Sequence, residues 1–345
     1  MTVSMDLRPQ TLRESFSFYV GGRDPARIRA CAELADAVVV SGISGPSTVR
    51  GLRNSGWDGT VLFDGVAYDK RESKLDPLKW FDDQWGAGAD RLLTPGQWVG
   101  SEPDHLPFMA QIENEVKLAT AHDATCLLAV DRRWFTQSRQ LDEMLLCLQV
   151  LKLPIALVLG DRSDPMGYTG AVDSLASVSS RVDNVSILRC DQAGIGALAF
   201  GATHASLGLT TRHRHVVPPD VQSFAKQNDR SARVFVRELL DWFTASRIGE
   251  WSTTSVTPNC YAACCDGEPI VRFLDDRFKS AADLHNRTVL AALAEEVLTA
   301  PQEDGVRRRE FGRICHEAVD RYGTMGGWMT KIEPKRQLTQ WASYC

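Results

Sequence analysis

The feature that most constrains the fold of this chain is a regular alternation of short apolar runs with amphipathic stretches between residues 16 and 211. The runs recur about every 20 to 30 residues, which suits repeated strand–helix units. Eight expected strands are Phe16–Gly21, Ala37–Gly42, Thr60–Gly65, Arg91–Thr94, Thr125–Asp131, Ile155–Gly160, Val185–Cys190 and His204–Leu209. This pattern predicts an α/β protein with a closed (β/α)8 TIM barrel. An open doubly wound sheet is the alternative, disfavoured because no expected strand is followed by a complete G-x-G-x-x-G loop.

The pattern changes after the eighth expected strand, where Pro218 and Pro219 interrupt any continuing element. A long amphipathic helix is predicted over Val221–Ser246, followed by a cluster of cysteines and by helices over Ala281–Leu298 and Arg307–Tyr322. We therefore expect a barrel over residues 1–220 and an appended region over 221–345. That region would contain the closing helix and a helical, zinc-type subdomain. The helices expected within the barrel are Pro25–Ala35, Leu106–Ala121, Gln140–Val150 and Val172–Val182.

Charge and hydropathy exclude several classes of protein. The 39 Lys and Arg residues against 44 Asp and Glu residues give a net charge of −5, so the chain is not a non-specific polycation. No run approaches the ~20 apolar residues that a membrane-spanning helix needs. Residues 1–20 lack the apolar core of a signal peptide. We expect a cytoplasmic protein with no membrane partner, whose nine cysteines are mostly reduced.

Three acidic residues lie at or just after the carboxyl ends of expected strands and are candidates for catalysis. They are Asp64, Asp131 and Asp191. In a TIM barrel the carboxyl ends of the strands surround the active site, so carboxylates there can act as nucleophile, general base or substrate-holding group. The structural alternative is that each acid caps the helix that follows, and this applies most to Asp191.

The second candidate site is a crowd of cysteines at Cys260, Cys264 and Cys265, followed by His285. Three thiolates and one imidazole match a closed tetrahedral zinc site, with structural Zn²⁺ as the expected cofactor. The alternative is a former metal site that has kept its cysteines. A site with four protein ligands would leave no open position for a catalytic water.

A basic cluster, Arg212-His213-Arg214-His215, follows the last expected strand. Loops after strands seven and eight of TIM barrels often bind phosphate, and an arginine can hold a phosphate through two parallel hydrogen bonds. The alternative is a solvated turn. Arg307–Arg309 and Arg313 form a second basic patch, for which a solvated helix face is the ordinary interpretation.

Taken in order, these motifs resemble the tRNA-guanine transglycosylase superfamily, especially its shorter relatives that act as DNA 7-deazaguanine transglycosylases. The resemblance runs from about Phe16 to Tyr322. It implies a zinc-bearing (β/α)8 barrel that exchanges guanine in a polynucleotide for a 7-deazaguanine base. It also implies pairing of subunits through the zinc region, as a homodimer or with a partner subunit.

Individual residues carry this resemblance. Asp64-Gly65-Val66-Ala67 is similar to the Asp-Ser-Gly-Gly segment of the family, whose Asp takes part in proton transfer or covalent chemistry. Asp131 lies where the family keeps an Asp that recognises the base. The family's nucleophilic Asp falls on Ser206, and a serine hydroxyl is a much poorer nucleophile unless a base activates it. Asp191 is a candidate for the role left vacant at Ser206.

The zinc motif of the family, C-x-C-x2-C with a later His-Asn, also has a counterpart here. Cys260, Ala262 and Cys265 fit its spacing, with Ala262 in place of the middle ligand and Cys264 close enough to substitute. His285-Asn286 matches the His-Asn pair. The resemblance thus implies that His285 and the three cysteines bind zinc.

The leading hypothesis is a transglycosylase that replaces guanine in DNA, or less readily in tRNA. The target base would be turned out of its stack, and Gly65, the basic cluster and Arg307–Arg309 would contact the substrate. Two alternatives remain open. One is a barrel enzyme acting on a free nucleoside or glycoside, and the other is a non-catalytic subunit that binds nucleic acid or a partner protein.

Overall fold

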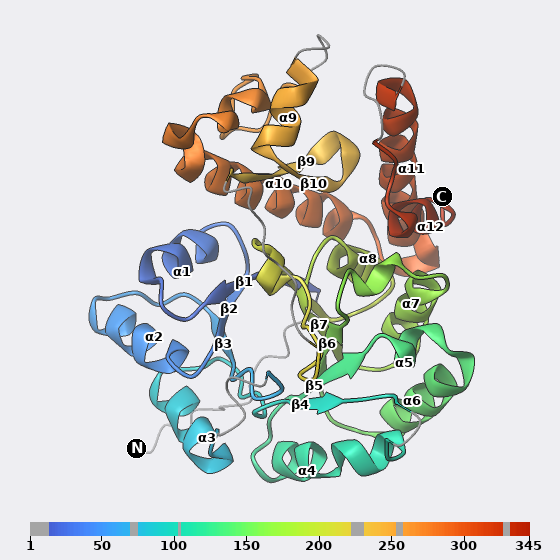
Figure 1. Ribbon diagram of the computed structural model, residues 1–345. Coiled ribbons are helices and arrows are strands. Elements are labelled where there is room, and N and C mark those ends of the chain that lie inside the picture. The colour runs from blue at the N-terminus through green and yellow to red at the C-terminus, as the bar shows by residue number, and fades with distance from the viewer. Residues whose placement is uncertain (1–13, 70–74, 103–104, 222–230, 253–257, 327–331) are drawn as a thin grey trace.

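The centre of the molecule is a curled sheet of eight parallel strands, in the spatial order β3-β2-β1-β8-β7-β6-β5-β4 (Figure 1). This is a computed structural model, and it describes residues 14–69, 75–102, 105–221, 231–252, 258–326 and 332–345. The strands are β1 (Ser15–Gly21), β2 (Ala37–Ser41), β3 (Val61–Asp64), β4 (Gln97–Val99), β5 (Cys126–Asp131), β6 (Ile155–Gly160), β7 (Val185–Cys190) and β8 (His204–Gly208). The order and direction of the strands are compatible with the predicted TIM-type fold.

The two edges of the curled sheet are joined through a short segment rather than through a ladder between β3 and β4. Arg91 forms an isolated parallel bridge to Leu62 of β3, and Leu93 forms another to Thr125. The fourth strand predicted at Arg91–Thr94 is therefore wrong in its bounds, because the ladder with β5 begins only at Gln97. Pro95, which has no N–H to donate, and Gly96, at φ +89°, separate the bridges from β4.

Helices cover the outer face of the sheet, as the alternating pattern predicts (Figure 1). Asp24 and Asp76 each accept a backbone N–H at a helix start, and a proline occupies the first helical position after each of them. The helical elements of this part are α1 (Pro25–Ala32), α2 (Gly45–Asn54), α3 (Pro77–Gly86), α4 (Phe108–Ala121), α5 (Arg133–Thr136), α6 (Ser138–Val150), η1 (Pro165–Gly167), α7 (Ala171–Arg181), α8 (Ala193–Ala199) and η2 (Thr211–His213).

The alternation of side chains along the strands divides the core into an inner and an outer layer. On β5, Leu127 and Ala129 belong to the inner layer, whereas Leu128 and Val130 pack beneath the helices. On β3, Leu62 belongs to the inner layer. Asp64 lies two positions further along the same strand, so it faces the interior at the carboxyl end of the sheet.

The C-terminal region lies against α7 and α8, at the top of the view in Figure 1. Its helix α10 and helix α11 contact α8, and α12 contacts α7 and η1. The elements are β9 (Arg233–Val236), η3 (Arg237–Leu239), β10 (Asp241–Thr244), α9 (Ala245–Ser252), η4 (Ile270–Leu274), η5 (Asp276–Phe278), α10 (Lys279–Thr299), η6 (Glu303–Gly305), α11 (Val306–Gly326) and α12 (Arg336–Ala342).

The long helix predicted at Val221–Ser246 is wrong over its described part. Residues 222–230 lie outside the described residues, and residues 233–244 form an antiparallel hairpin of β9 and β10. The hairpin turns through η3 and Leu240, which adopts a left-handed conformation at φ 47°. The segment has neither Gly nor Asn at the turn, so the usual sequence signal of a hairpin is missing.

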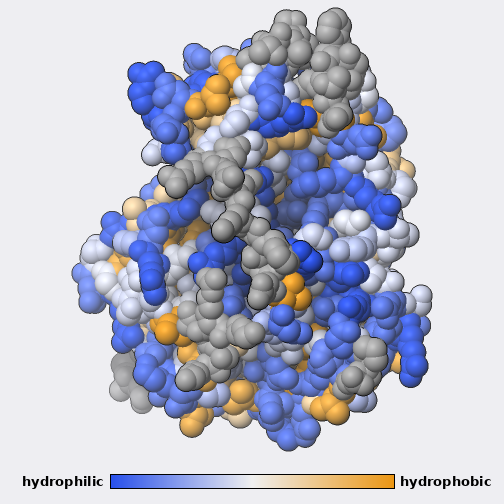
Figure 2. Space-filling model, in the orientation of Figure 1, coloured by the Kyte–Doolittle hydropathy of each residue, from blue (hydrophilic) through white to orange (hydrophobic). Residues whose placement is uncertain are grey.

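Hydrophilic residues predominate on the face shown in Figure 2, and hydrophobic residues occur there as small separate patches. Among the described residues, each helix is either too short or too polar to cross a lipid bilayer.

Candidate functional site

Asp64 is the centre of a buried polar cluster at the carboxyl end of the parallel strands. Its carboxylate is 0% exposed. Oδ2 accepts hydrogen bonds from the hydroxyls of Tyr19 and Tyr68, each at 2.6 Å, and Oδ1 accepts one from the backbone N–H of Val66 at 2.8 Å. A Cβ at Gly65 would lie 2.7 Å from Cδ2 of Leu75, so a larger residue directly after Asp64 would require the Leu75 side chain to shift.

Arg189 of β7 brings a positive charge to this cluster. The residue is 5% exposed, and its Nη1 donates to the Tyr68 hydroxyl at 3.4 Å. Nε and Nη2 donate to the backbone carbonyl of Arg212 at 3.2 and 2.9 Å. We call Tyr19, Asp64, Tyr68 and Arg189 the Asp64 cluster. It comes from three strands and the loop after β3.

The protons of the Asp64 cluster are held by the tyrosines and the arginine. Burial raises the pKa of Asp64, and the hydrogen bonds from Tyr19 and Tyr68 oppose that rise. Burial, followed by the negative charge of Asp64, raises the pKa of both tyrosines. The two hydroxyls therefore stay protonated and donate to the carboxylate.

The segment Thr210–Val216, which we call the strap, passes from the end of β8 to the end of β6. Val216 pairs with Gly160, and its carbonyl accepts the N–H of Asp161. The ring of His213 lies against Tyr19, with 5.4 Å between the ring centroids. Burial, and then the charge of Arg189, lower the pKa of His213 to about 3, so its imidazole is neutral. The strap thus runs over the strand ends, and its His213 lies beside the Asp64 cluster.

Asp131 and Asp191 make their own local contacts and share no hydrogen bond with Asp64. Oδ1 of Asp131 accepts from the Ser101 hydroxyl and from the backbone N–H of Arg133, both at 2.9 Å. Oδ1 of Asp191 accepts from the backbone N–H of Ala193 at 3.0 Å, at the start of α8. Both acids therefore make the helix-start contacts that the structural alternative describes.

Ser206 lies deeper inside the curled sheet than Asp64. It is 0% exposed, and its Oγ has no hydrogen-bond partner among the described residues. On the neighbouring strand β1 it pairs with Ser17, whereas Tyr19 pairs with Gly208. Ser206 is therefore one inward-facing position below the level of Tyr19, and within the described part of the chain no base is hydrogen-bonded to its hydroxyl to activate it.

The basic cluster after β8 is split between solvent and protein contacts. Arg212 is exposed. The guanidinium of Arg214 lies 3.5 Å from the ring centroid of Trp242 and donates to the carbonyls of Gly208 and Leu209 at 3.3 and 3.4 Å. Burial lowers the pKa of His215. Arg212 is the member of this cluster whose side chain faces water.

Arg307 is not part of a solvent-facing basic patch. It is 4% exposed and donates to the carbonyls of Ala300 and Leu298 at 2.9 and 3.1 Å. Arg307 therefore caps free backbone carbonyls at the C-terminal end of α10. Arg313 is paired with Glu310 and Glu317 on its own helix. The substrate role expected for Arg307 is therefore wrong, because its donors are already used inside the protein.

A cavity of about 450 Å³ adjoins the Asp64 cluster on the side of β3 and β4. Tyr68 belongs to both, since its hydroxyl bonds Asp64 while the residue also lines the cavity. Other lining residues are Asp69, Gln97, Trp98 and Glu115. This volume lies within the usual range of small-molecule sites.

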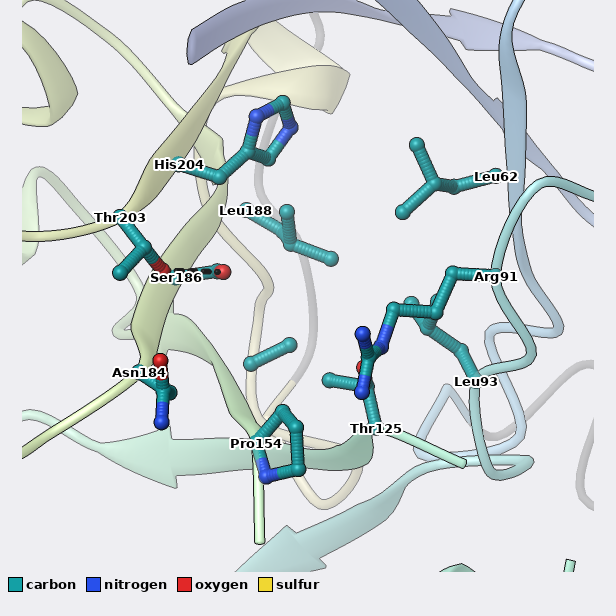
Figure 3. Close-up of a pocket in the computed structure, with 11 residues that line it drawn as sticks. Leu62, Arg91, Leu93, Thr125, Pro154, Asn184, Ser186, Leu188, Thr203 and His204 are labelled. Carbon is teal, nitrogen blue, oxygen red and sulfur yellow. Dashed lines mark hydrogen bonds between the residues drawn. The ribbon is translucent and has the colours of Figure 1, made fainter. Parts of the chain in front are cut away.

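A second cavity, of about 30 Å³, lies at the opposite, amino end of the strands (Figure 3). Arg91 reaches toward it from one side, and Ser186, Thr203 and His204 line the other. Both ring nitrogens of His204 bond serine hydroxyls, those of Ser15 and Ser17, at 2.9 Å. The space suits one or two water molecules rather than a substrate.

The cysteines and the histidine predicted to bind metal do meet in the C-terminal region. One ligand atom from each of Cys260, Cys264, Cys265 and His285 lies within 4.8 Å of all the others. Sγ of Cys265 is 3.3 Å from Nδ1 of His285 and 3.6 Å from Sγ of Cys264. We call these four residues the Cys/His cluster, and they form a group that can bind a metal ion.

The orientation of His285 favours a metal at its Nδ1. Its Nε2 lies 2.9 Å from the carbonyl of Phe235 and donates its proton there, which leaves Nδ1 unprotonated and facing the thiols. Burial lowers the pKa of His285 and raises that of Cys265 to about 12. Four buried or half-buried polar groups thus face one another, and a divalent cation would satisfy them together.

A scan against models of known protein families finds no match to this chain, and a search of curated proteins finds no significant relative.

Sequence reasoning missed three members of the Asp64 cluster, Tyr19, Tyr68 and Arg189. Arg189 carried a usable signal, because it is a charged residue inside the otherwise apolar run of β7. Tyr19 and Tyr68 gave little sequence signal of a site, since aromatic residues in strands and turns are ordinary core residues.

Proposed function

We propose that this protein is a transglycosylase that exchanges guanine in a polynucleotide, DNA in preference to tRNA, for a 7-deazaguanine base. In this proposal the curled sheet is a closed (β/α)8 barrel, and the C-terminal region contains a structural zinc ion. The observation that carries the proposal is a buried carboxylate, Asp64, at the carboxyl end of β3, one tyrosine away from a cavity of about 450 Å³. This is the position in which the resemblance puts the reacting acid.

Asp64 would act on the sugar rather than on the base. As the glycosidic bond breaks, its electron pair leaves with the guanine, which takes up a proton, and positive charge develops at the anomeric carbon. An ionised carboxylate near that carbon stabilises the charge. The incoming base then forms its bond to the same carbon and gives up a proton. Tyr19 and Tyr68 hold Asp64 in place through their hydroxyls.

The strap has to move before a nucleotide reaches Asp64, because the carboxylate is 0% exposed. Arg189 fastens the strap through the carbonyl of Arg212, and His213 packs on Tyr19. A base turned out of its stack would displace His213 and approach Asp64 from the side of β8. Arg212 is exposed on the strap, and its guanidinium would bind a flanking phosphate.

Zinc in the Cys/His cluster would be structural. Cys260, Cys264, Cys265 and His285 would supply four protein ligands, which fill a tetrahedral site and leave no position for a reacting water. The ion would join the loop after α9 to helix α10.

A non-catalytic subunit is the second candidate function. The observation that favours it is that the carboxylate oxygens of Asp64 already accept three hydrogen bonds and are shielded from solvent. Such a cluster can simply stabilise the barrel, and the protein would then bind nucleic acid or a partner without chemistry.

Labelled guanine separates these functions. The full chain is incubated with labelled guanine and, in parallel, with duplex DNA, tRNA or free guanosine. Our proposal predicts label in the DNA, with less in the tRNA. Label in guanosine alone would identify a nucleoside enzyme instead. Label in none of the three, with DNA retained by the protein in a binding assay, would support the non-catalytic subunit.

A further inference from the structure

The cavity of about 450 Å³ contains a buried acid that the proposed reaction does not use. Glu115 lies on the inward face of α4 and is 6% exposed. Its Oε2 accepts the backbone N–H of Gly96 at 3.3 Å, and its carboxylate also accepts the hydroxyl of Thr94. No ion pair joins Glu115 to a basic side chain among the described residues. A buried carboxylate without a cation is costly, so it marks a place where a ligand can supply the missing charge.

Glu113, two residues earlier on the same helix, shows the ordinary arrangement. It is exposed, and one of its oxygens lies 2.6 Å from Nζ of Lys117, one turn further along. Glu115 points the other way, toward β4 and the cavity. The two glutamates therefore differ in environment while sharing a helix, which provides a matched control for any test of Glu115.

About half of the described residues in the cavity wall are apolar, the others are aromatic, polar or acidic, and none of them is positively charged. Tyr68 and Trp98 line it, and so does Gln97. Asp69 also lines the cavity, but it has an interaction partner of its own. None of the described lining residues is Lys, Arg or His. Aromatic faces attract cations through their negative π-systems, and a carboxylate attracts them directly. The wall is thus suited to a positive, partly flat ligand and unsuited to a phosphate.

We propose that this cavity binds a small organic cation, a primary amine or amidinium carried on a flat ring. The cationic group pairs with Glu115, and the ring lies against Trp98. This inference does not depend on the proposed exchange reaction, since the cavity can bind an amine whether or not the chain acts on a polynucleotide. Tyr68, shared with the Asp64 cluster, would make such a ligand a direct neighbour of Asp64.

Four probe molecules of similar shape test the charge requirement with the full chain. Benzylamine and benzamidine are cationic at neutral pH, benzyl alcohol is a neutral counterpart, and benzoate is an anion. Binding is measured by calorimetry and by the change in tryptophan fluorescence. We expect the two cations to bind at least about tenfold more tightly than benzyl alcohol, and benzoate not to bind. Equal binding of benzyl alcohol and benzylamine, or no binding of either cation at millimolar concentration, would overturn the inference.

Two substitutions then locate the site. Glu115→Gln keeps the shape and removes the charge, so it should weaken benzylamine binding about tenfold, while Glu113→Gln should leave it unchanged. Unchanged binding in a folded Glu115→Gln variant would contradict the proposal. If that variant does not fold, Gln97→Lys serves instead, because it supplies an ammonium group inside the cavity. It should abolish benzylamine binding, and retained binding would again contradict the assignment.

Discussion

The Asp64 cluster and the Cys/His cluster are both buried and polar, but their polar atoms differ in whether they have hydrogen-bond partners within the protein. In the Asp64 cluster, tyrosine hydroxyls, a backbone N–H and a guanidinium already meet the carboxylate and one another. In the Cys/His cluster, three thiols and the Nδ1 of His285 face one another without a strong donor between them.

This difference separates two roles that a polar cluster can have. A group whose polar atoms satisfy one another is stable by itself and reacts only when something displaces part of it. A group of converging ligands is stable only with the ion that it surrounds. The first therefore suits a gated reaction centre and the second a structural metal site, and each role makes its own prediction about removal of one member.

The largest effect is expected from loss of the metal. Cys265→Ser should abolish zinc binding and destabilise the protein, because an ion present at a thousand times its Kd contributes about 4 kcal/mol to folding. Metal analysis should find about one zinc per chain in the unaltered protein and none in the variant. The control is Cys345→Ser, at an exposed cysteine outside the cluster. A metal-free protein that keeps its full thermal stability would remove the contrast between the two clusters.

The second effect concerns the buried charge of the Asp64 cluster. Arg189→Met leaves Asp64 without its positive neighbour and the Arg212 carbonyl without donors. We expect a loss of about 3 kcal/mol in the free energy of unfolding, measured by urea titration. A loss below about 1 kcal/mol would mean that the cluster does not depend on this charge.

The buried, neutral His213 of the strap predicts that the stability of the protein falls as the pH falls. Burial, and then the charge of Arg189, lower the pKa of His213 from an ordinary 6.5 to about 3. The unfolded chain therefore binds this proton first, and the protein should lose stability as the pH falls below about 6.5, by roughly 2 kcal/mol at pH 5 and further down to about pH 3. His213→Gln should remove that part of the pH dependence in urea titrations. An identical pH profile in both proteins would show that His213 is not held neutral by burial.

The smallest effect is expected from one hydroxyl. Tyr68→Phe removes one of three donors to Asp64 and should cost about 1 kcal/mol in stability. Tyr261→Phe is the control, since Tyr261 is 80% exposed and its change should be neutral. Thermal unfolding of both variants checks this prediction. Equal stability of the two would indicate that Tyr68 contributes nothing to the cluster.

Much of the fold was predictable because β-branched and apolar runs mark buried parallel strands clearly. The runs that became β1, β2, β3, β5, β6, β7 and β8 were predicted to within one residue at each end. The fourth strand was displaced, because Arg91-Leu92-Leu93 looks more strand-like than Gln97-Trp98-Val99, and only the closure of the curled sheet distinguishes them.

The β9–β10 hairpin was not predictable for a local reason. Its sequence, RVFVRELLDWFT, satisfies a helical as well as a strand pattern, and the turn depends on Leu240 in a conformation that leucine rarely adopts. Packing of Phe235 against Trp242, with 5.4 Å between ring centroids, stabilises the hairpin over the helix. Tertiary contacts here override the local preference.

In the candidate sites, too, the sequence identifies single residues but not the partners that the folded chain brings to them. The Cys/His residues were predicted because thiols and imidazole at short spacing are rare, and the structure brings all four together. Asp64 was predicted from its place at a strand end. Its partners Tyr19 and Arg189 come from strands separated from it by many residues, so only the folded sheet brings them together. Glu115 was hidden among the acids of an ordinary amphipathic helix.

The most direct test of the account is the rate of guanine exchange into DNA for Asp64→Asn beside Asp58→Asn. Asp58 is exposed and lies just before the amino end of β3, so the two substitutions alter opposite ends of one strand. With both variants folded by circular dichroism, we predict that Asp64→Asn lowers the exchange rate at least about a hundredfold and that Asp58→Asn leaves it unchanged. Exchange by Asp64→Asn at the rate of the unaltered protein would contradict the central claim.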